Sequence, residues 1–386
     1  MTVKPRVPLV LISGLASEAA LLLADRFHAA DRHTAVVHHD LRNIAAGFVL
    51  RRLRCGPREA LTTVAVTHGC ASRALREDLL PLVRELAGRP DIARIVVRLD
   101  EAMEPEPVCE ALGEVPGEHP MSTGVEVEAV VTVIDIATWL TDVTGEDTMA
   151  DRGLGASEDD DRTVAGVALA QAEFADVLAV TGDAADARSA AKTGAVLERV
   201  APLAAILGLP AADPASLAGF VSGEAHRGRP RDPHAALLRG APPLHTDCGV
   251  TIVPFASARP FHPHRLHDAL ESLLDGVVRA RGRAWVAGRP DVALWIESAG
   301  GTLGVGHAGA WLDSPEGPAW TEVSAERRTL ASLRWHPVFG DRAQELVIVA
   351  DGADPVAVTE ALERALLTDE EIAEDGTMII GRHNTA

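Results

Sequence analysis

The first half of the chain alternates short apolar runs with longer segments of helical period. The runs are rich in Val, Ile and Leu, show little alternation with polar residues, and cover residues 8–13, 34–37, 93–99, 129–134 and 175–180. Such continuous runs are typical of parallel strands that helices cover on both faces. Helical segments lie between them at residues 17–29, 76–86 and 185–200. The pattern predicts a doubly wound α/β domain.

The second half has a different rhythm. Residues 250–255 predict a strand, and residues 263–279 predict a helix because Leu266, Leu270 and Leu273 recur every three or four positions. Further strands are expected at 283–287, 292–298, 303–308 and 345–350, and further helices at 324–333 and 354–367. This mixture predicts a smaller α+β domain.

A proline-rich stretch separates the two halves. Residues 210–248 contain six prolines and an Arg-Gly-Arg run, a composition typical of a linker. We therefore expect an α/β domain at 1–209, a linker at 210–248, an α+β domain at 249–370 and a tail at 371–386.

The charge balance narrows the choice of partners. Of the 386 residues, 56 are acidic and 36 are Lys or Arg, which gives a formal charge of −20. This charge repels nucleic-acid phosphates and favours a basic protein partner. The apolar run at 7–24 is interrupted by Glu18 and is too short to span a bilayer, so we expect no membrane contact and a cytoplasmic protein. The four scattered cysteines are expected to be reduced thiols.

The turn after the first strand is where a nucleotide-binding α/β protein would hold phosphate. It reads Ser13-Gly14-Leu15-Ala16-Ser17-Glu18. A P-loop needs two glycines, a lysine for the phosphates and a Ser or Thr for magnesium. This turn has one glycine and no lysine, and Glu18 adds a negative charge. An ordinary strand-to-helix turn is the preferred interpretation.

Several motifs nevertheless resemble those of the CobW-like GTPases. Residues 69–80, Gly-Cys-Ala-Ser-Arg-Ala-Leu-Arg-Glu-Asp-Leu-Leu, resemble that family's G-C-x-C-C-T-L-R-x-D-L signature. The other matching segments are 163–178, 259–267, 276–287 and 340–347. The resemblance implies a P-loop-NTPase-like α/β domain followed by a CobW-type C-terminal α+β domain.

Within the family, an actinobacterial subgroup gives the best resemblance. Its members recruit a ribosome-hibernation protein under zinc limitation, and the segments at 68–72, 171–176 and 259–287 fit its pattern. The resemblance implies a basic partner, such as a hibernation factor or a ribosomal protein.

The metal motif of the family is incomplete in this chain. Cys70 matches the first cysteine of C-x-C-C, but Ser72 and Arg73 replace the other two. One thiolate cannot hold zinc tightly, because such sites need several soft or imidazole ligands. His68 is a second candidate ligand, and Cys55 or Cys109 could complete the set if the fold brings them close. The alternative, preferred by a small margin, is that Cys70 is a small buried hydrophobic residue.

The nucleotide motifs of the family are altered as well. In the switch-like E-x-x-G-x-x-x-P segment, Arg98 replaces the magnesium-linked acid and Glu101 replaces the glycine. The base-reading N-K-x-D element aligns with residues 181–184, where Asp183 is only a displaced carboxylate. These changes argue against a conventional GTPase and against bound GTP and Mg²⁺. The nucleotide positions that remain as candidates are Ser13, Gly14, Ser17 and Asp183, and no catalytic residue is assigned.

Histidines offer weaker metal candidates. His262, His264 and His267 lie within six residues, but the first belongs to the family's C-terminal pattern and is expected to serve packing and capping. The pair His38-His39 follows the second predicted strand and is treated as incidental.

Three hypotheses remain open. The leading one is a GTPase-like scaffold that has lost catalysis and recruits a hibernation factor to the ribosome under zinc limitation. The second is a GTP-dependent zinc metallochaperone with an atypical site that includes His68 and Cys70. The third is a small-molecule-binding domain that uses the phosphate-facing end of the sheet without hydrolysis.

Overall fold

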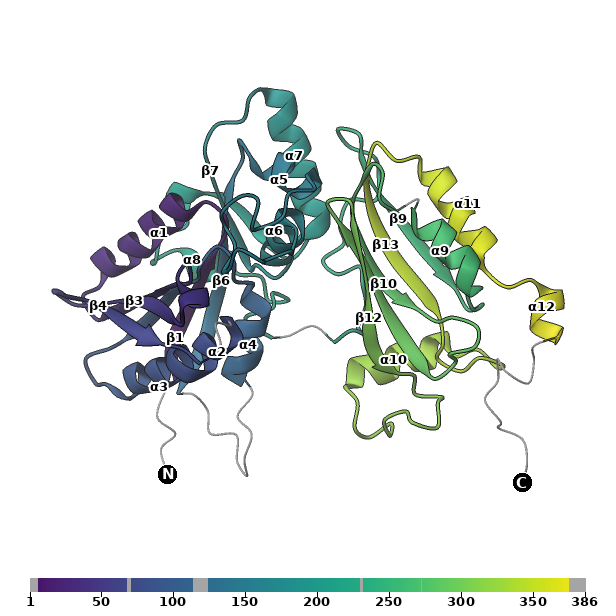
Figure 1. Cartoon of the computed structure of the whole chain (residues 1–386), viewed down its shortest axis with the longest axis horizontal. Helices are drawn as coiled ribbons and strands as arrows, with labels where there is room; N and C mark the ends of the chain where they lie inside the picture. Colours follow the sequence, from purple (N-terminus) through teal and green to yellow (C-terminus); the bar gives the residue numbers. More distant parts are fainter. Residues whose placement is uncertain (1–5, 68–70, 114–123, 230–231, 272, 375–386) are drawn as a thin grey trace. The chain divides into compact units, whose positions relative to one another are not determined.

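The computed structural model describes residues 6–67, 71–113, 124–229, 232–271 and 273–374. The chain forms two compact units (Figure 1). Unit 1 comprises Met1–Thr193 and Val200–Pro230, and unit 2 comprises Gly194–Arg199 and Arg231–Ala386. Each unit has its own sheet and its own hydrophobic core.

Unit 1 is built on a mostly parallel sheet. Among the described residues it has eight strands in the order β4-β3-β2-β5-β1-β6-β7-β8. Their bounds are β1 Val7–Ser13, β2 Thr34–Asp40, β3 Phe48–Cys55, β4 Arg58–Ala65, β5 Arg94–Arg98, β6 Val125–Asp135, β7 Val177–Thr181 and β8 Ala205–Gly208. The β2–β3 and β3–β4 pairs are antiparallel, whereas the other strand pairs described in this sheet are parallel, so a β3–β4 hairpin forms one edge.

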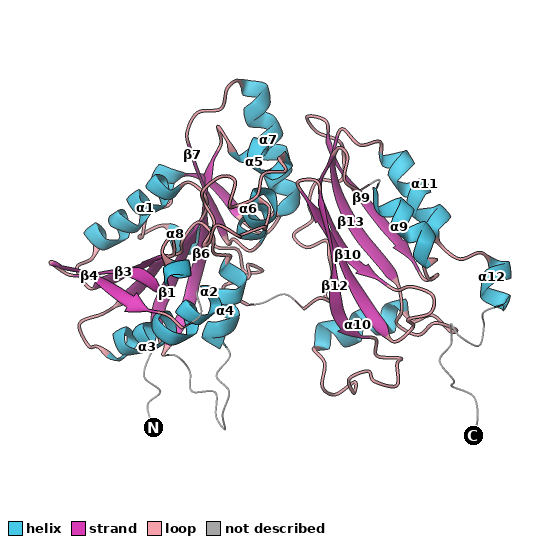
Figure 2. Cartoon of the chain, in the orientation of Figure 1, coloured by secondary structure: helices cyan, strands magenta, loops and turns pink. Residues whose placement is uncertain are grey.

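Helices cover both faces of this sheet (Figure 2). They are α1 Ser17–Ala30, α2 Ala71–Ala74, the π-helix η2 Leu75–Leu79, α3 Leu80–Gly88, α4 Pro105–Gly113, α5 Trp139–Thr144, α6 Val164–Glu173, α7 Ala187–Val200 and α8 Leu217–Phe220; short 3₁₀ turns, η1 and η3, lie at Ile44–Ala46 and Leu209–Ala211.

Strand β1 shows why its sequence is apolar throughout. Leu9 and Leu11 belong to the core beneath α3, whereas Val10 and Ile12 belong to the core beneath α1. Successive side chains of a strand point to opposite faces, so a strand with helices on both sides needs apolar residues at every position. The predicted doubly wound α/β fold is confirmed.

The segment predicted as a linker, 210–248, is divided between the units. Ala212, Leu217 and Val221 are buried in the same core as α1, so the described residues up to 229 belong to unit 1. Residues after 231 pack in unit 2, where the Arg283 guanidinium donates hydrogen bonds to the carbonyls of Pro233 (2.6 Å) and Ala235 (2.7 Å). Much of this proline-rich segment therefore makes tertiary contacts.

Unit 2 is the smaller α+β domain that was predicted, and its sheet is antiparallel. Its order among the described residues is β12-β11-β10-β13-β9, with β9 Val250–Ser257, β10 Val277–Ala284, β11 Val292–Ala299, β12 Thr302–Ala310 and β13 Gln344–Asp351. Its helices are α9 Pro263–Glu271, α10 Ala325–Arg334, α11 Pro355–Ala365 and α12 Asp369–Glu374. Leu266, Leu270 and Leu362 of α9 and α11 share one core with Leu346 and Ile348 of β13.

The predicted helix over 263–279 is wrong in its last part. Helix α9 ends at Glu271, and Val277 already begins strand β10. Gly276 makes this reversal, because its φ of +66° belongs to the left-handed region and a Cβ there would lie 2.5 Å from the Ala353 amide nitrogen. Val277 continued the helical spacing by chance.

Among the described residues, no helix is long and apolar enough to cross a membrane.

Candidate functional site

The turn between β1 and α1 is short and fixed in place. Only three residues separate Ser13 at the end of the strand from Ser17 at the start of the helix. Gly14 has a φ of +128°, and a Cβ added to it would lie 2.3 Å from the carbonyl oxygen of Val133 in β6. In a P-loop, G-x-x-x-x-G-K-S/T, five residues separate the first glycine from the lysine, and the backbone amides of this loop surround a phosphate. Here α1 begins three residues after Gly14.

The side chain of Ser13 is engaged inside the core. Its hydroxyl lies 2.8 Å from the Thr132 hydroxyl, and Thr132 in turn donates to the carbonyl of Gln171 over 2.7 Å. Because Thr132 uses its proton on Gln171, Ser13 donates to Thr132. Ser13 and Thr132 are both buried, so this chain of hydrogen bonds ties β1, β6 and α6 together.

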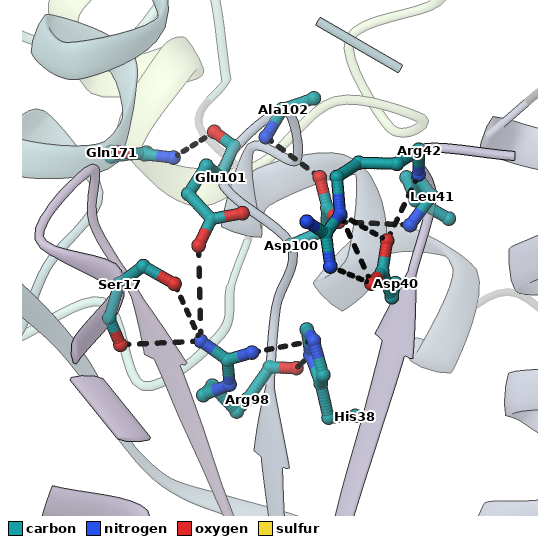
Figure 3. A network of polar contacts seen from close by, with 10 residues as sticks. All are labelled: Ser17, His38, Asp40, Leu41, Arg42, Arg98, Asp100, Glu101, Ala102 and Gln171. Carbon is teal, nitrogen blue, oxygen red and sulfur yellow. Dashed lines mark hydrogen bonds and ion pairs between the residues drawn. The ribbon is translucent and has the colours of Figure 1, made fainter. Parts of the chain in front are cut away.

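Arg98, at the end of β5, connects the turn to the neighbouring strand (Figure 3). One terminal nitrogen of its guanidinium donates to the Ser17 hydroxyl (3.1 Å) and carbonyl (3.3 Å). The other terminal nitrogen donates to Nε2 of His38. The nearest carboxylate is that of Glu101, at 3.8 Å. A buried cation therefore lies next to the first turn of α1.

His38 is the acceptor that this arginine requires. Its Nε2 accepts from the guanidinium, so Nδ1 carries the ring proton and donates to the Arg98 carbonyl over 3.1 Å. Burial, and next the charge of Arg98, lower the pKa of His38 to about 4. Burial also lowers the pKa of Arg98. His38 is therefore neutral at pH 7. Although the sequence analysis treated His38 as incidental, the structure makes it part of this network.

The segment that follows Arg98 is held by several hydrogen bonds. Asp100 accepts from the amides of Leu41 (2.9 Å) and Ala102 (3.1 Å), and burial raises its pKa to about 6. The Gln171 amide group donates to the carbonyls of Glu101 and Met103, each over 3.0 Å. The part of the chain that aligns with a switch segment is thus fixed to β2 and α6.

The remaining nucleotide candidate lies elsewhere on the same edge of the sheet. Asp183 is exposed and follows β7, and β6 lies between β7 and β1 in the strand order. Gly182 before it has a φ of +76°, and a Cβ there would lie 2.3 Å from Oδ1 of Asp135. The structure brings Ser13, Gly14 and Ser17 together and places Asp183 apart from them, after β7.

The two metal candidates, His68 and Cys70, lie outside the described residues. Within the described ranges, no group of three or more His, Cys, Asp or Glu side chains could hold a metal ion. Cys109 is packed in the core of unit 1, and burial raises the pKa of its thiol far above the usual value, which disfavours the thiolate that zinc requires. His262 accepts a hydrogen bond from the Arg265 amide (3.4 Å), in keeping with the capping role predicted for it.

A second polar cluster includes the aspartate of the signature segment and was missed in the sequence. Asp78, in the π-helix η2, accepts from His39 (2.6 Å) and from Arg51 (2.7 Å). Burial acts to raise the pKa of Asp78, but the hydrogen bonds from His39 and Arg51 hold it below its usual value. A π-helix often marks a functional position. The sequence feature that could have revealed this cluster is the Arg-x-Asp-Leu part of the signature. Its aspartate, Asp78, joins β2 and β3 to this helix.

An α/β unit of nucleotide-binding type followed by a small antiparallel α+β unit defines the class of protein. Residues 19–207 match the family model described as "CobW/HypB/UreG, nucleotide-binding domain", and residues 250–366 match the "Cobalamin synthesis protein cobW C-terminal domain". The chain belongs to the CobW family. The first match begins after the β1–α1 turn.

Two curated relatives and one solved structure illustrate this membership. The protein named "Zinc chaperone Rv0106" of Mycobacterium tuberculosis (strain ATCC 25618 / H37Rv) is 42% identical over 353 residues, which cover 88% of this chain and 83% of the relative. "Zinc-regulated GTPase metalloprotein activator 1" of Dictyostelium discoideum is 25% identical over 340 residues, covering 84% and 70%. The zinc-bound YjiA GTPase of E. coli is 14% identical, with a TM-score of 0.37 over 95% of this chain and 100% of that one.

Proposed function

We propose that this CobW-family chain serves the response to zinc limitation by binding a basic protein of the translation machinery, such as a ribosome-hibernation factor, rather than by hydrolysing GTP. The names of the two relatives, a zinc chaperone and a zinc-regulated GTPase, support a role in zinc handling. The formal charge of −20 supports a basic partner, because complementary charge speeds association and disfavours wrong partners.

The position of Arg98 is the observation that supports the absence of GTP hydrolysis. It aligns with the acid that the family pattern links to magnesium, and its buried guanidinium lies beside Ser17. Phosphoryl transfer depends on Mg²⁺ and lysine to neutralise phosphate charge. A cation at this position repels Mg²⁺, and the three-residue turn contains no lysine. These residues do not fit a GTP–Mg²⁺ complex.

An exposed aromatic pair in unit 2 supports the binding of a protein partner. The rings of Trp320 and Trp335, which flank α10, lie 5.8 Å apart and remain 39% and 41% exposed. Leu333 and Val338, which are two and three residues from Trp335 in the sequence, are 77% and 47% exposed. We call these four residues the tryptophan patch. Exposed apolar clusters mark protein-binding surfaces, tryptophan is enriched at their energetic centres, and its ring face attracts Lys and Arg.

Hydrogen bonds also hold the backbone of the tryptophan patch in place. The Arg328 guanidinium donates to the carbonyls of Trp320 (3.1 Å) and Val323 (2.6 Å), which fixes the segment before α10 against the helix. A preorganised patch loses less conformational entropy when a partner binds.

Calorimetry tests the loss of nucleotide binding. Purified protein is titrated with GTP and with GDP, with and without Mg²⁺ and Zn²⁺. We expect no binding in the micromolar range under any condition. Magnesium-dependent GTP binding would contradict this half of the proposal.

Affinity purification tests the partner. Tagged protein from zinc-starved cells should retain ribosomal proteins and a hibernation factor, and the double substitution Trp320→Ser/Trp335→Ser should release them. Val356→Ser is the control, since Val356 is an exposed apolar residue in α11 of the same unit. Equal retention by both variants would remove the tryptophan patch from the proposal, and absence of these proteins from the wild type would remove the partner.

The second candidate function is a GTP-dependent zinc chaperone. The printed names of the two relatives favour it, since one is a chaperone and the other a GTPase. It requires stoichiometric zinc bound below micromolar concentration and lost in Cys70→Ser, together with Mg²⁺-dependent GTP binding. Zinc binding without GTP binding would instead favour a zinc-responsive protein that does not use GTP.

A further inference from the structure

Unit 1 has a pocket of about 280 Å³ between α1 and the β3–β4 hairpin. It belongs to unit 1, whereas the tryptophan patch belongs to unit 2, and it shares His38 and Arg98 with the site at the β1–α1 turn. The proposed function requires no ligand in it. Leucines from three elements form its apolar wall: Leu21 of α1, Leu50 of β3 and Leu61 of β4. Leu21 is 40% exposed and Leu61 is 64% exposed. Exposed leucines on both sides of a concave surface leave apolar area that a bound ligand could cover.

The polar part of the pocket is dominated by arginine. Arg42, Arg52, Arg54 and Arg98 line it, and Asp40 is its one carboxylate among the described lining residues. Asp40 is already held by Arg42 (Figure 3), and that hydrogen bond keeps the pKa of Asp40 below its usual value. The other three arginines also have carboxylate partners: Glu59 for Arg52, Asp25 and Glu59 for Arg54, and Glu101 for Arg98. These acids are not among the residues that line the pocket, so the guanidinium groups are the main charged groups that a ligand would meet there.

Two of these arginines are suited to an incoming anion. The buried Nε of Arg98 has no hydrogen-bond partner among the described residues, although its terminal nitrogens are engaged. Arg52 is paired with Glu59 at 3.1 Å, and both side chains are about half exposed. Exposed pairs of this kind contribute about 0–1 kcal/mol, so a ligand anion can replace the Glu59 carboxylate at little cost.

We propose that this pocket binds a small amphipathic anion, with a carboxylate or phosphate head at Arg52 and Arg98 and a short apolar body against Leu21, Leu50 and Leu61. The volume is near the lower end for small-molecule sites, so it suits a short chain or a small ring system. Arginine presents a planar fork of donors that matches both head groups. The inference adds a ligand class that neither zinc handling nor GTP binding requires.

Fluorescence displacement with the full chain tests this proposal. The probe is 8-anilinonaphthalene-1-sulfonate, an aromatic sulfonate that combines an anion with an apolar body. We expect saturable probe fluorescence that octanoate or octyl phosphate displaces, while uncharged octanol at equal concentration does not. The anion that displaces at the lower concentration identifies the preferred head group.

Two exposed lining positions provide variants that should fold. Arg52→Glu reverses a charge and Leu61→Glu adds one at the apolar wall; each should weaken displacement by about tenfold, or about 1.4 kcal/mol. Arg188→Glu in α7 and Val356→Glu in α11 are the matched controls on exposed surface, and they should leave displacement unchanged. The proposal is overturned if the wild type gives no saturable fluorescence, if octanol displaces as well as octanoate and octyl phosphate, or if the lining variants behave like the controls.

Discussion

Arg98 and His38 hold each other by two hydrogen bonds in opposite directions. The guanidinium donates to Nε2 of the ring, and the ring Nδ1 donates to the Arg98 carbonyl over 3.1 Å (Figure 3). The pair fixes the ring orientation and the tautomer, and it requires a neutral histidine. It also anchors the end of β5 to β2 beside the β1–α1 turn, where a conventional GTPase would need room for phosphate and magnesium.

The first prediction concerns the pH dependence of stability. The folded-state pKa of His38 is about 4 and the unfolded value is 6.5, so the unfolded state binds more protons between these limits. The contribution of His38 is complete above pH 6.5 and is lost as the pH falls toward 4. His38→Gln, whose amide can both accept and donate, should remove this loss. Relative to the variant, the wild type should lose about 1.4 kcal/mol per pH unit at most within that window.

Urea denaturation at pH 7.5 and pH 5 measures this difference. Asp100 acts in the opposite direction: its folded pKa of about 6 is raised above 3.8, so its contribution is present at low pH and is lost as the pH rises through 6. The comparison must therefore be made between wild type and His38→Gln, since the total slope contains both groups. His264→Gln, at an exposed histidine, is the control. The same pH dependence in wild type and His38→Gln would contradict the assigned neutral state.

The second prediction concerns the β1–α1 turn. Gly14→Ala places a methyl group 2.3 Å from the Val133 carbonyl oxygen at a φ of +128°. The free energy of unfolding should fall by several kcal/mol, roughly 3 or more, because both the clash and the backbone conformation are unfavourable. Gly194→Ala in α7 is the control, since no atom lies within 4 Å of the added Cβ and alanine favours helix. Similar midpoints for both variants in thermal unfolding would show that the turn can move away from β6.

The continuous apolar runs predicted the parallel strands β1, β2, β5, β6 and β7 of the unit 1 sheet, but the short parallel strand β8 and the β3–β4 hairpin were missed. Strand β3 carries Arg51, Arg52 and Arg54, and most of β4 is exposed. An edge hairpin is stabilised by its pairing with β2, and a strand with a solvated face does not need the apolar composition of a buried one. The pocket formed by this hairpin could therefore not be predicted from the sequence.

The candidate site was predictable only in part. The family motifs placed Ser13, Gly14 and Arg98 at the nucleotide edge of the sheet, and these residues do lie near one another. Their partners come from distant positions, as Ser13 and Thr132 are 119 residues apart and His38 and Arg98 are 60 apart. Sequence patterns give local periodicity, whereas the state of a buried polar group depends on partners that only the fold brings into contact.

The third prediction concerns the cysteines. Burial raises the pKa of the Cys109 thiol far above its usual value, and that of Cys55 is raised too but less strongly, with Cys55 only partly buried. The thiolate is the reactive form, so Cys109 should not react with iodoacetamide at pH 8 in the folded protein. Peptide mapping before and after denaturation in urea measures the labelling at each cysteine. Rapid labelling of native Cys109 would mean that the core of unit 1 opens readily.

The fourth prediction tests whether Arg98 alone prevents nucleotide binding. Arg98→Glu restores a carboxylate at the position that the family pattern links to magnesium, yet the turn still has three residues and no lysine. GTP titration with Mg²⁺ should therefore show no binding in either wild type or variant. The substitution should also destabilise unit 1 by about 3 kcal/mol or more, because the new carboxylate lies beside Glu101 and His38 loses its donor. Arg98→Met, which removes the charge without reversing it, should be less destabilising. The prediction is wrong if Arg98→Glu binds GTP with Mg²⁺ in the micromolar range and Arg98→Met does not. That result would show that the short turn accommodates phosphate and that Arg98 alone prevents GTP binding.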